Sequence, residues 1–166
     1  MTVDECYHET GRLAAKLVAE CSARGLKIST AESCTGGMVS GAVTSVSGSS
    51  AVIELGICSY SNRIKHEVLG VSNAILDRFT EYSVQCAEAM AEGVRRLAGA
   101  DFAVSTTGVA GPTGGSEEHP VGEVCIAVSG KDGCQGERFV FPGDREQVRA
   151  QAALKALELL SDKVSS

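Results

Sequence analysis

Apolar residues recur at helical spacing in several segments of the chain. This periodicity predicts long helices over about 4–23, 38–46, 84–97 and 144–160 and shorter ones over 63–69 and 72–79. Ser83 is a good N-cap for the helix that follows it. Residues 144–147 have the pattern of a capping box at the start of the last helix.

Other segments combine β-branched and apolar residues over shorter lengths, which predicts strands. We expect them at about 26–30, 52–60 and 100–107, and a hairpin of 121–128 and 138–141 around a polar turn at 129–136. Helices and strands alternate first, and a hairpin and a closing helix follow. This order predicts an α/β fold, a three-layer α/β/α single domain over residues 1–166 with a mixed β-sheet.

Composition narrows the function classes. A formal net charge of −6 opposes binding to a polyanionic nucleic acid. No apolar run approaches the ~20 residues that span a bilayer, and the N-terminus lacks the pattern of a signal peptide. The seven cysteines include no pair at metal-ligand spacing. We therefore expect a cytoplasmic protein with reduced, mostly buried cysteines, and no metal, nucleic-acid or membrane partner.

Glycine is abundant and unevenly placed. Nine of the 19 glycines fall within 36–48 and 108–122. The second segment also holds two prolines, which predicts a long loop rather than a regular element. Long loops in compact domains are often functional, so we expect backbone amides of both segments to line a ligand site.

The first candidate site is the turn at 32–37, between a predicted strand and a predicted helix. Free backbone N–H groups at such a helix start favour an anion such as phosphate. A plain N-cap with glycines for a tight bend explains the pattern equally well. The candidate binding residues are Glu32, Ser33, Thr35, Gly36 and Gly37.

Cys34 in the same turn is a second possible reactive group. A thiol at a helix start can have a lowered pKa and act as a nucleophile, but no neighbouring base is evident, which favours a buried, inert thiol. The three histidines are isolated in sequence, which favours surface or hydrogen-bonded roles over metal binding.

The second candidate joins Ser49 and Ser50 to Tyr60 and Lys65. A desolvated lysine with a lowered pKa can take the proton of a serine hydroxyl, and a tyrosine can relay it. The alternative is structural: the serines cap a turn, Tyr60 ends a strand and Lys65 is solvated. Neither a G-x-G-x-x-G nor a Walker-type motif is present, so dinucleotide and nucleoside-triphosphate chemistry lose their main support.

The long loop and the last helix supply the remaining candidates. Glycines let backbone amides approach a ligand closely, and the alternative interpretation of the loop is a flexible surface hairpin. Two arginines share a helix face and would suit a phosphate or, equally, solvent. The residues concerned are Thr107, Gly108, Gly111, Gly115, Arg145 and Arg149.

Five motifs in this order and spacing resemble the CinA C-terminal domain family over about residues 8–160. They are T-A-E-S-C-T-G-G (30–37), G-S-S (48–50), Y-S-N-x-x-K (60–65), T-G-V-A-G-P-T-G-G-S-E-E-H-P-V-G (107–122) and G-D-R-E-x-V-R (143–149). Thr113 departs from the family pattern, in which many relatives carry aspartate. That departure leaves the loop intact and puts a carboxylate role there in doubt.

The resemblance implies a nicotinamide-nucleotide amidase, a hydrolase of a linear amide bond. It would convert nicotinamide mononucleotide and water to nicotinate mononucleotide and ammonia in pyridine nucleotide salvage, without a cofactor. On this basis Ser50 is the expected nucleophile, with Tyr60 and Lys65 activating it and Ser49 as the neighbouring choice. The phosphate would meet helix N-termini or the two arginines, and a carboxylate such as Glu32 would face the pyridinium ring.

Two other functions stay open. One is a non-catalytic nucleotide-binding or regulatory module of the same family, and the other is a thiol amidase that uses Cys34. For a small α/β enzyme we also expect a homo-oligomer.

Overall fold

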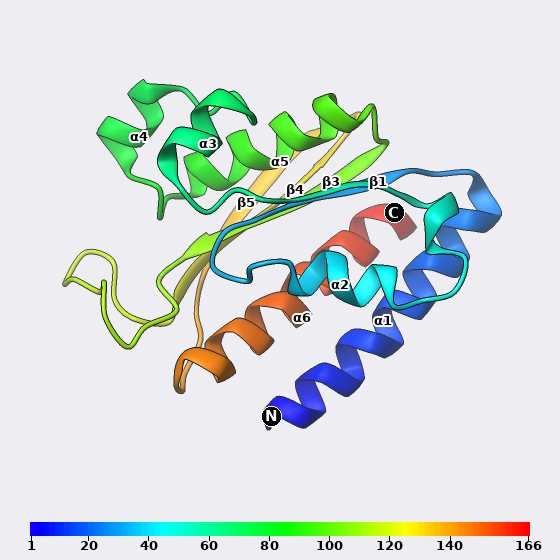
Figure 1. Ribbon diagram of the computed structural model, residues 1–166, viewed down its shortest axis with the longest axis horizontal. Helices are drawn as coiled ribbons and strands as arrows, with labels where there is room; N and C mark the ends of the chain where they lie inside the picture. The colour runs from blue at the N-terminus through cyan, green and yellow to red at the C-terminus, as the bar shows by residue number, and fades with distance from the viewer.

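The computed structural model describes all residues, 1–166 (Figure 1). The elements follow in the order α1 (Val3–Arg24), β1 (Ile28–Glu32), α2 (Met38–Thr44), the 3-10 turn η1 (Ser49–Ala51), β2 (Ile53–Cys58), α3 (Asn62–Glu67), α4 (Asn73–Phe79), α5 (Val84–Ala98), β3 (Phe102–Gly108), β4 (Glu123–Gly130), β5 (Gly133–Val140) and α6 (Arg145–Ser165). None of the helices combines the length and apolarity that a membrane crossing needs.

The five strands form one mixed sheet in the order β2-β1-β3-β4-β5. β1 pairs in parallel with β2 and with β3, whereas β3, β4 and β5 pair antiparallel. The carboxyl ends of β1, β2 and β3 therefore meet at one edge of the sheet. In open α/β sheets that edge is where ligand sites form.

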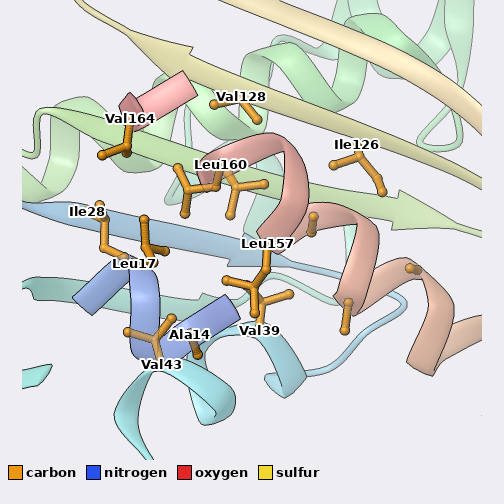
Figure 2. Packing of buried hydrophobic residues seen from close by; sticks show 14 of the residues in the cluster. Ala14, Leu17, Ile28, Val39, Val43, Ile126, Val128, Leu157, Leu160 and Val164 are labelled. Carbon is orange, nitrogen blue, oxygen red and sulfur yellow. The ribbon is translucent and has the colours of Figure 1, made fainter. Parts of the chain in front are cut away.

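Helices cover both faces of the sheet, so the predicted three-layer α/β/α arrangement is confirmed. Figure 1 shows α1, α2 and α6 on one side and α3, α4 and α5 on the other. The larger core lies on the first side, where Leu17, Ile28 and Leu157 belong to one cluster of buried residues (Figure 2). Aromatic rings contribute little to it, and five of the seven free cysteines are buried.

The hairpin differs from its prediction. β4 and β5 extend to Gly130 and from Gly133, so only two residues separate them, where the sequence predicts a polar turn over 129–136. Exposed and half-buried positions alternate along β5, which is an edge strand. One face of β5 is solvated, so the strand is rich in polar residues, and the apolar pattern used to predict strands does not detect it.

One glycine of α5 is fixed by close packing. A Cβ on Gly93 would lie 2.0 Å from the carbonyl oxygen of Leu69, a backbone atom that cannot move cheaply, whereas a Cβ on Gly11 in α1 would meet nothing within 4 Å. We expect Gly93→Ala to lower the free energy of unfolding by about 2–3 kcal/mol. Gly11→Ala should raise it by about 0.5–1 kcal/mol through helix propensity. Chemical denaturation measures both, and equal effects would contradict the packing argument.

Candidate active site

Ser33 and Lys65 meet at the carboxyl edge of the sheet. Ser33 follows β1 directly, and its N–H donates to the carbonyl of Thr106 on β3 at 2.9 Å. Lys65 lies on α3, the short helix that begins after β2 and is capped by the Ser61 side chain. Because β1 and β2 are parallel neighbours, the two segments that leave them come together.

The Lys65 amine is buried and directed at the serine. Lys65 is 1% exposed, and its Nζ lies 3.1 Å from Ser33 Oγ and 2.8 Å from the carbonyl oxygen of Ser59. Burial lowers the pKa of Lys65, because desolvation disfavours the charged ammonium. A neutral amine within hydrogen-bond distance of a hydroxyl is the arrangement in which lysine activates a serine nucleophile.

Backbone donors lie directly after Ser33. The N–H groups of Cys34, Thr35 and Gly37 donate to no acceptor within the chain, while that of Gly36 bonds to the Ser33 carbonyl at 3.1 Å. Unpaired N–H groups beside a nucleophile are the donors that stabilise a tetrahedral oxyanion. The turn 33–37 thus offers a nucleophile together with candidate oxyanion donors.

Glu32 has a structural role. Its carboxylate accepts hydrogen bonds from the N–H groups of Val39 and Ser40 and from the hydroxyls of Thr35 and Ser40, at 2.7 to 3.0 Å. Glu32 therefore occupies the start of α2, where an external anion was expected, and has little capacity left for a cationic ring. Thr35 is likewise committed, since its hydroxyl also bonds to that of Thr106 at 2.7 Å.

Tyr60 and Arg145 form the outer rim of this edge. Tyr60 is 62% exposed, and its hydroxyl accepts from Arg145 Nη2 at 3.1 Å. Arg145 Nη1 also donates to the carbonyl of Gly111 at 2.8 Å. The structure thus brings together parts of three sequence motifs, with Tyr60 beside an arginine rather than in contact with the buried amine.

Arg149 stabilises the turn 33–37, which we call the nucleophile turn, through hydrogen bonds to its backbone. Its guanidinium donates to the carbonyls of Cys34 and Thr35 at 3.0 and 3.1 Å, and a Cβ on Gly36 would lie 3.2 Å from its Nη2. These contacts use the donors that were expected to hold phosphate. The arginine instead fixes the backbone that carries the free N–H groups.

The glycines at 108–122 are mostly required by packing within the chain. Gly108 belongs to β3, so we call residues 109–122 the glycine-rich loop. A Cβ on Gly108 would lie 2.2 Å from the Glu123 carbonyl oxygen, and Cβ atoms on Gly111 and Gly115 would meet Val121 at 2.5 and 2.8 Å. Thr107 is also engaged, since its hydroxyl donates to the Glu81 carbonyl at 2.6 Å.

Ser50 does not join the other expected catalytic residues. It lies in η1, before β2 begins, whereas Tyr60 and Lys65 follow the end of β2. The six residues of that strand span about 20 Å, so Ser49 and Ser50 stand at the opposite edge of the sheet. The serine that contacts Lys65 is Ser33, which the sequence placed only among the binding residues; its position directly after a parallel strand was the available signal.

The surroundings of Cys34 argue against the hypothesis of a thiol amidase. Burial raises the pKa of this thiol to about 12, because the thiolate is desolvated. The thiolate is the reactive form of cysteine, so Cys34 is largely unreactive at neutral pH.

None of the five main cavities is lined by Ser33, Lys65 or Tyr60. The serine–lysine pair lies just beneath the surface, with Lys65 1% and Ser33 9% exposed.

The structure is thus a single α/β/α domain with a buried serine–lysine pair at the carboxyl edge of its parallel strands. The model of the CinA C-terminal domain matches residues 10–164, so the chain belongs to the CinA C-terminal domain family.

Relatives and solved structures agree with this assignment. The chain is 47% identical to the nicotinamide-nucleotide amidohydrolase PncC of Enterobacter agglomerans, over 88% of this chain and 90% of that protein. It is 49% identical to a CinA-like protein of Anaeromyxobacter dehalogenans over 87% of its own length, but spans only 35% of that longer relative. The crystal structure of the competence/damage inducible protein CihA from Agrobacterium tumefaciens superposes with a TM-score of 0.92 at 38% identity, covering 95% of this chain and 96% of that one.

Proposed function

We propose that this chain is a nicotinamide-nucleotide amidohydrolase that converts nicotinamide mononucleotide and water to nicotinate mononucleotide and ammonia. The observation that carries the proposal is the 3.1 Å contact between the buried Lys65 amine and the Ser33 hydroxyl. Similarity to an amidohydrolase that aligns over 90% of its own length supports the choice of reaction. In this proposal Ser33 replaces Ser50 as the nucleophile.

The reaction would proceed through an ester on Ser33. The neutral Lys65 amine takes the hydroxyl proton while Oγ attacks the amide carbon, and the free N–H groups that follow Ser33 stabilise the oxyanion. When the carbon–nitrogen bond breaks, the Lys65 ammonium returns the proton to the departing ammonia. Water then attacks the ester, Lys65 removes one of its protons, and Ser33 recovers that proton when the carbon–oxygen bond to Oγ breaks. The product leaves as the carboxylic acid, whose remaining proton passes to solvent.

Arg145 is the proposed partner of the substrate phosphate. It is an exposed arginine at the rim whose present partners are the neutral Tyr60 hydroxyl and a backbone carbonyl. A phosphate would be a stronger partner, because charge-assisted hydrogen bonds exceed those between neutral groups. Arg149 faces the turn and is better suited to hold its shape.

Ammonia release from nicotinamide mononucleotide tests the reaction, with the second product identified by chromatography. We expect turnover by the unmodified chain, and turnover within about twofold of it in Ser50→Ala, because Ser50 is an exposed residue at the far edge of the sheet. Absence of ammonia release from a folded wild-type chain would refute the proposed activity. Loss of turnover in Ser50→Ala would instead restore Ser50 as the nucleophile.

A further inference from the structure

One histidine fastens the glycine-rich loop to the segment that precedes α5. His119 Nδ1 lies 3.1 Å from Glu123 Oε1, and its Nε2 lies 3.2 Å from Thr80 Oγ1. A carboxylate only accepts hydrogen bonds, so Nδ1 carries a hydrogen, and the imidazole bridges Glu123 and Thr80. Glu123 is 1% exposed and also binds Arg138 at 2.7 Å, so its position is fixed from two sides.

Thr80 has an unfavourable backbone conformation. Its φ and ψ are 67° and 169°, and it is the only residue other than glycine with a positive φ. This region of backbone space is almost exclusive to glycine, and other residues persist there only where their surroundings hold them. The Thr80 hydroxyl supplies such support: besides its bond to His119 it accepts the N–H of Tyr82 at 3.3 Å, and the Tyr82 ring packs 5.6 Å from the imidazole.

The segment that His119 reaches lies beside the catalytic pair. The carbonyl of Glu81 accepts from the Thr107 hydroxyl at 2.6 Å, which fixes this segment over the end of β3. The Glu81 carboxylate is close enough to Lys65 for its charge to oppose the lowering of that amine's pKa. His119 therefore connects the C-terminal part of the glycine-rich loop to the segment 80–82, which borders the site.

At its other end the same loop contacts Arg145 through the carbonyl of Gly111. Gly111 accepts from Arg145, which in turn donates to Tyr60. Between the two attachments the loop is closed on itself by hydrogen bonds from Ser116 N–H to the His119 carbonyl, 2.8 Å, and from His119 N–H to the Ser116 hydroxyl, 3.0 Å. A loop held at both sides in this way fixes the Gly111 carbonyl relative to the nucleophile turn.

We propose that His119 is a positioning residue for substrate binding, acting through Thr80 and Glu123 to hold the glycine-rich loop in the form that aligns Arg145. This inference rests on the proposed deamidation. Loss of the His119 contacts with Thr80 and Glu123, which we call the lock, should change KM with little change in kcat. These contacts support Tyr60 and Arg145 at the rim and not the Ser33–Lys65 pair.

Thr80→Gly separates this role from a structural one. Glycine removes the hydroxyl but relieves the backbone, so we expect Tm to stay constant or rise while the lock is lost. Deuterium uptake of the amides in 109–122 should then be faster. KM for nicotinamide mononucleotide should rise by about 3- to 10-fold, the worth of one or two hydrogen bonds, with kcat within about twofold.

Two further variants complete the test. Thr80→Ser keeps the hydroxyl and should restore both uptake and KM to near wild type. Lys163→Met, which breaks an ion pair with Asp132 at the opposite edge of the sheet, should change neither.

Unchanged uptake and KM in Thr80→Gly would overturn the proposal, as would a parallel fall of Tm and kcat at constant KM. If the wild-type chain released no ammonia, the proposed function would fail, and the uptake of Thr80→Gly against Thr80→Ser would still decide whether the Thr80 hydroxyl, which contacts His119 and the Tyr82 N–H, holds the loop.

Discussion

Replacing Ser33 by alanine should lower kcat for ammonia release by at least about 10³-fold, while KM changes little. Removing a nucleophile abolishes the covalent route and leaves only the contribution of binding and oxyanion stabilisation. Steady-state kinetics with nicotinamide mononucleotide measure both constants. Ser33 is 9% exposed and its hydroxyl contacts only Lys65, so the fold should tolerate the change.

Ser49→Ala is the matched control for Ser33→Ala. Ser49 is buried to a similar degree, at 8% exposure, but lies in η1. It should retain wild-type kinetics and a wild-type thermal transition. Equal activity of the Ser33→Ala and Ser49→Ala variants would show that Ser33 is not the nucleophile.

Replacing Lys65 by methionine should reduce kcat by about 10² to 10⁴-fold, the usual contribution of a general base. Methionine preserves most of the buried volume and removes the amine that contacts Ser33 and the Ser59 carbonyl. The variant should remain folded, because an apolar side chain replaces a desolvated amine. Circular dichroism establishes folding, and wild-type turnover by the folded variant would exclude Lys65 as the base.

The same lysine predicts the direction of the pH dependence. Only the neutral amine can take the serine proton, so kcat should rise as pH increases through the lowered pKa of Lys65 and level off above it. Between that pKa and the ordinary value near 10.5 the unfolded chain binds more protons than the folded one, so stability should also rise with pH in this interval. A rate that falls with pH over the same range would contradict the assignment of Lys65 as the base.

Local patterns were sufficient to predict most of the fold. The capping box at Asp144 and the N-cap at Ser83 are both formed, and the glycine after α1, Gly25, adopts the left-handed conformation that ends the helix. β5 was missed because an edge strand with one solvated face need not be apolar. Its residues acquire strand structure from pairing with β4, which is not a local property.

The sequence predicts which residue types form the candidate site, a serine and a lysine, but not which serine contacts the lysine. The sequence predicts Ser50, with Ser49 as the neighbouring choice, beside Lys65, whereas Ser33 is predicted only as a binding residue. Strand direction decides between them, because only the serine after β1 shares an edge with a residue that follows β2. Contacts such as that between Thr80 and His119 join residues 39 positions apart and leave no periodic trace in the sequence.

The commitment of Glu32 to α2 has a consequence for how substrate preference can diverge among relatives of this chain. Since Glu32 and Arg149 hold the nucleophile turn entirely through contacts within the chain, no charge of the substrate is needed to shape it. In the proposed function the substrate phosphate meets Arg145, which lies in the first turn of α6, outside the nucleophile turn. We therefore expect mutations that change which amide is accepted to fall in the glycine-rich loop and the first turn of α6 rather than in the turn 33–37.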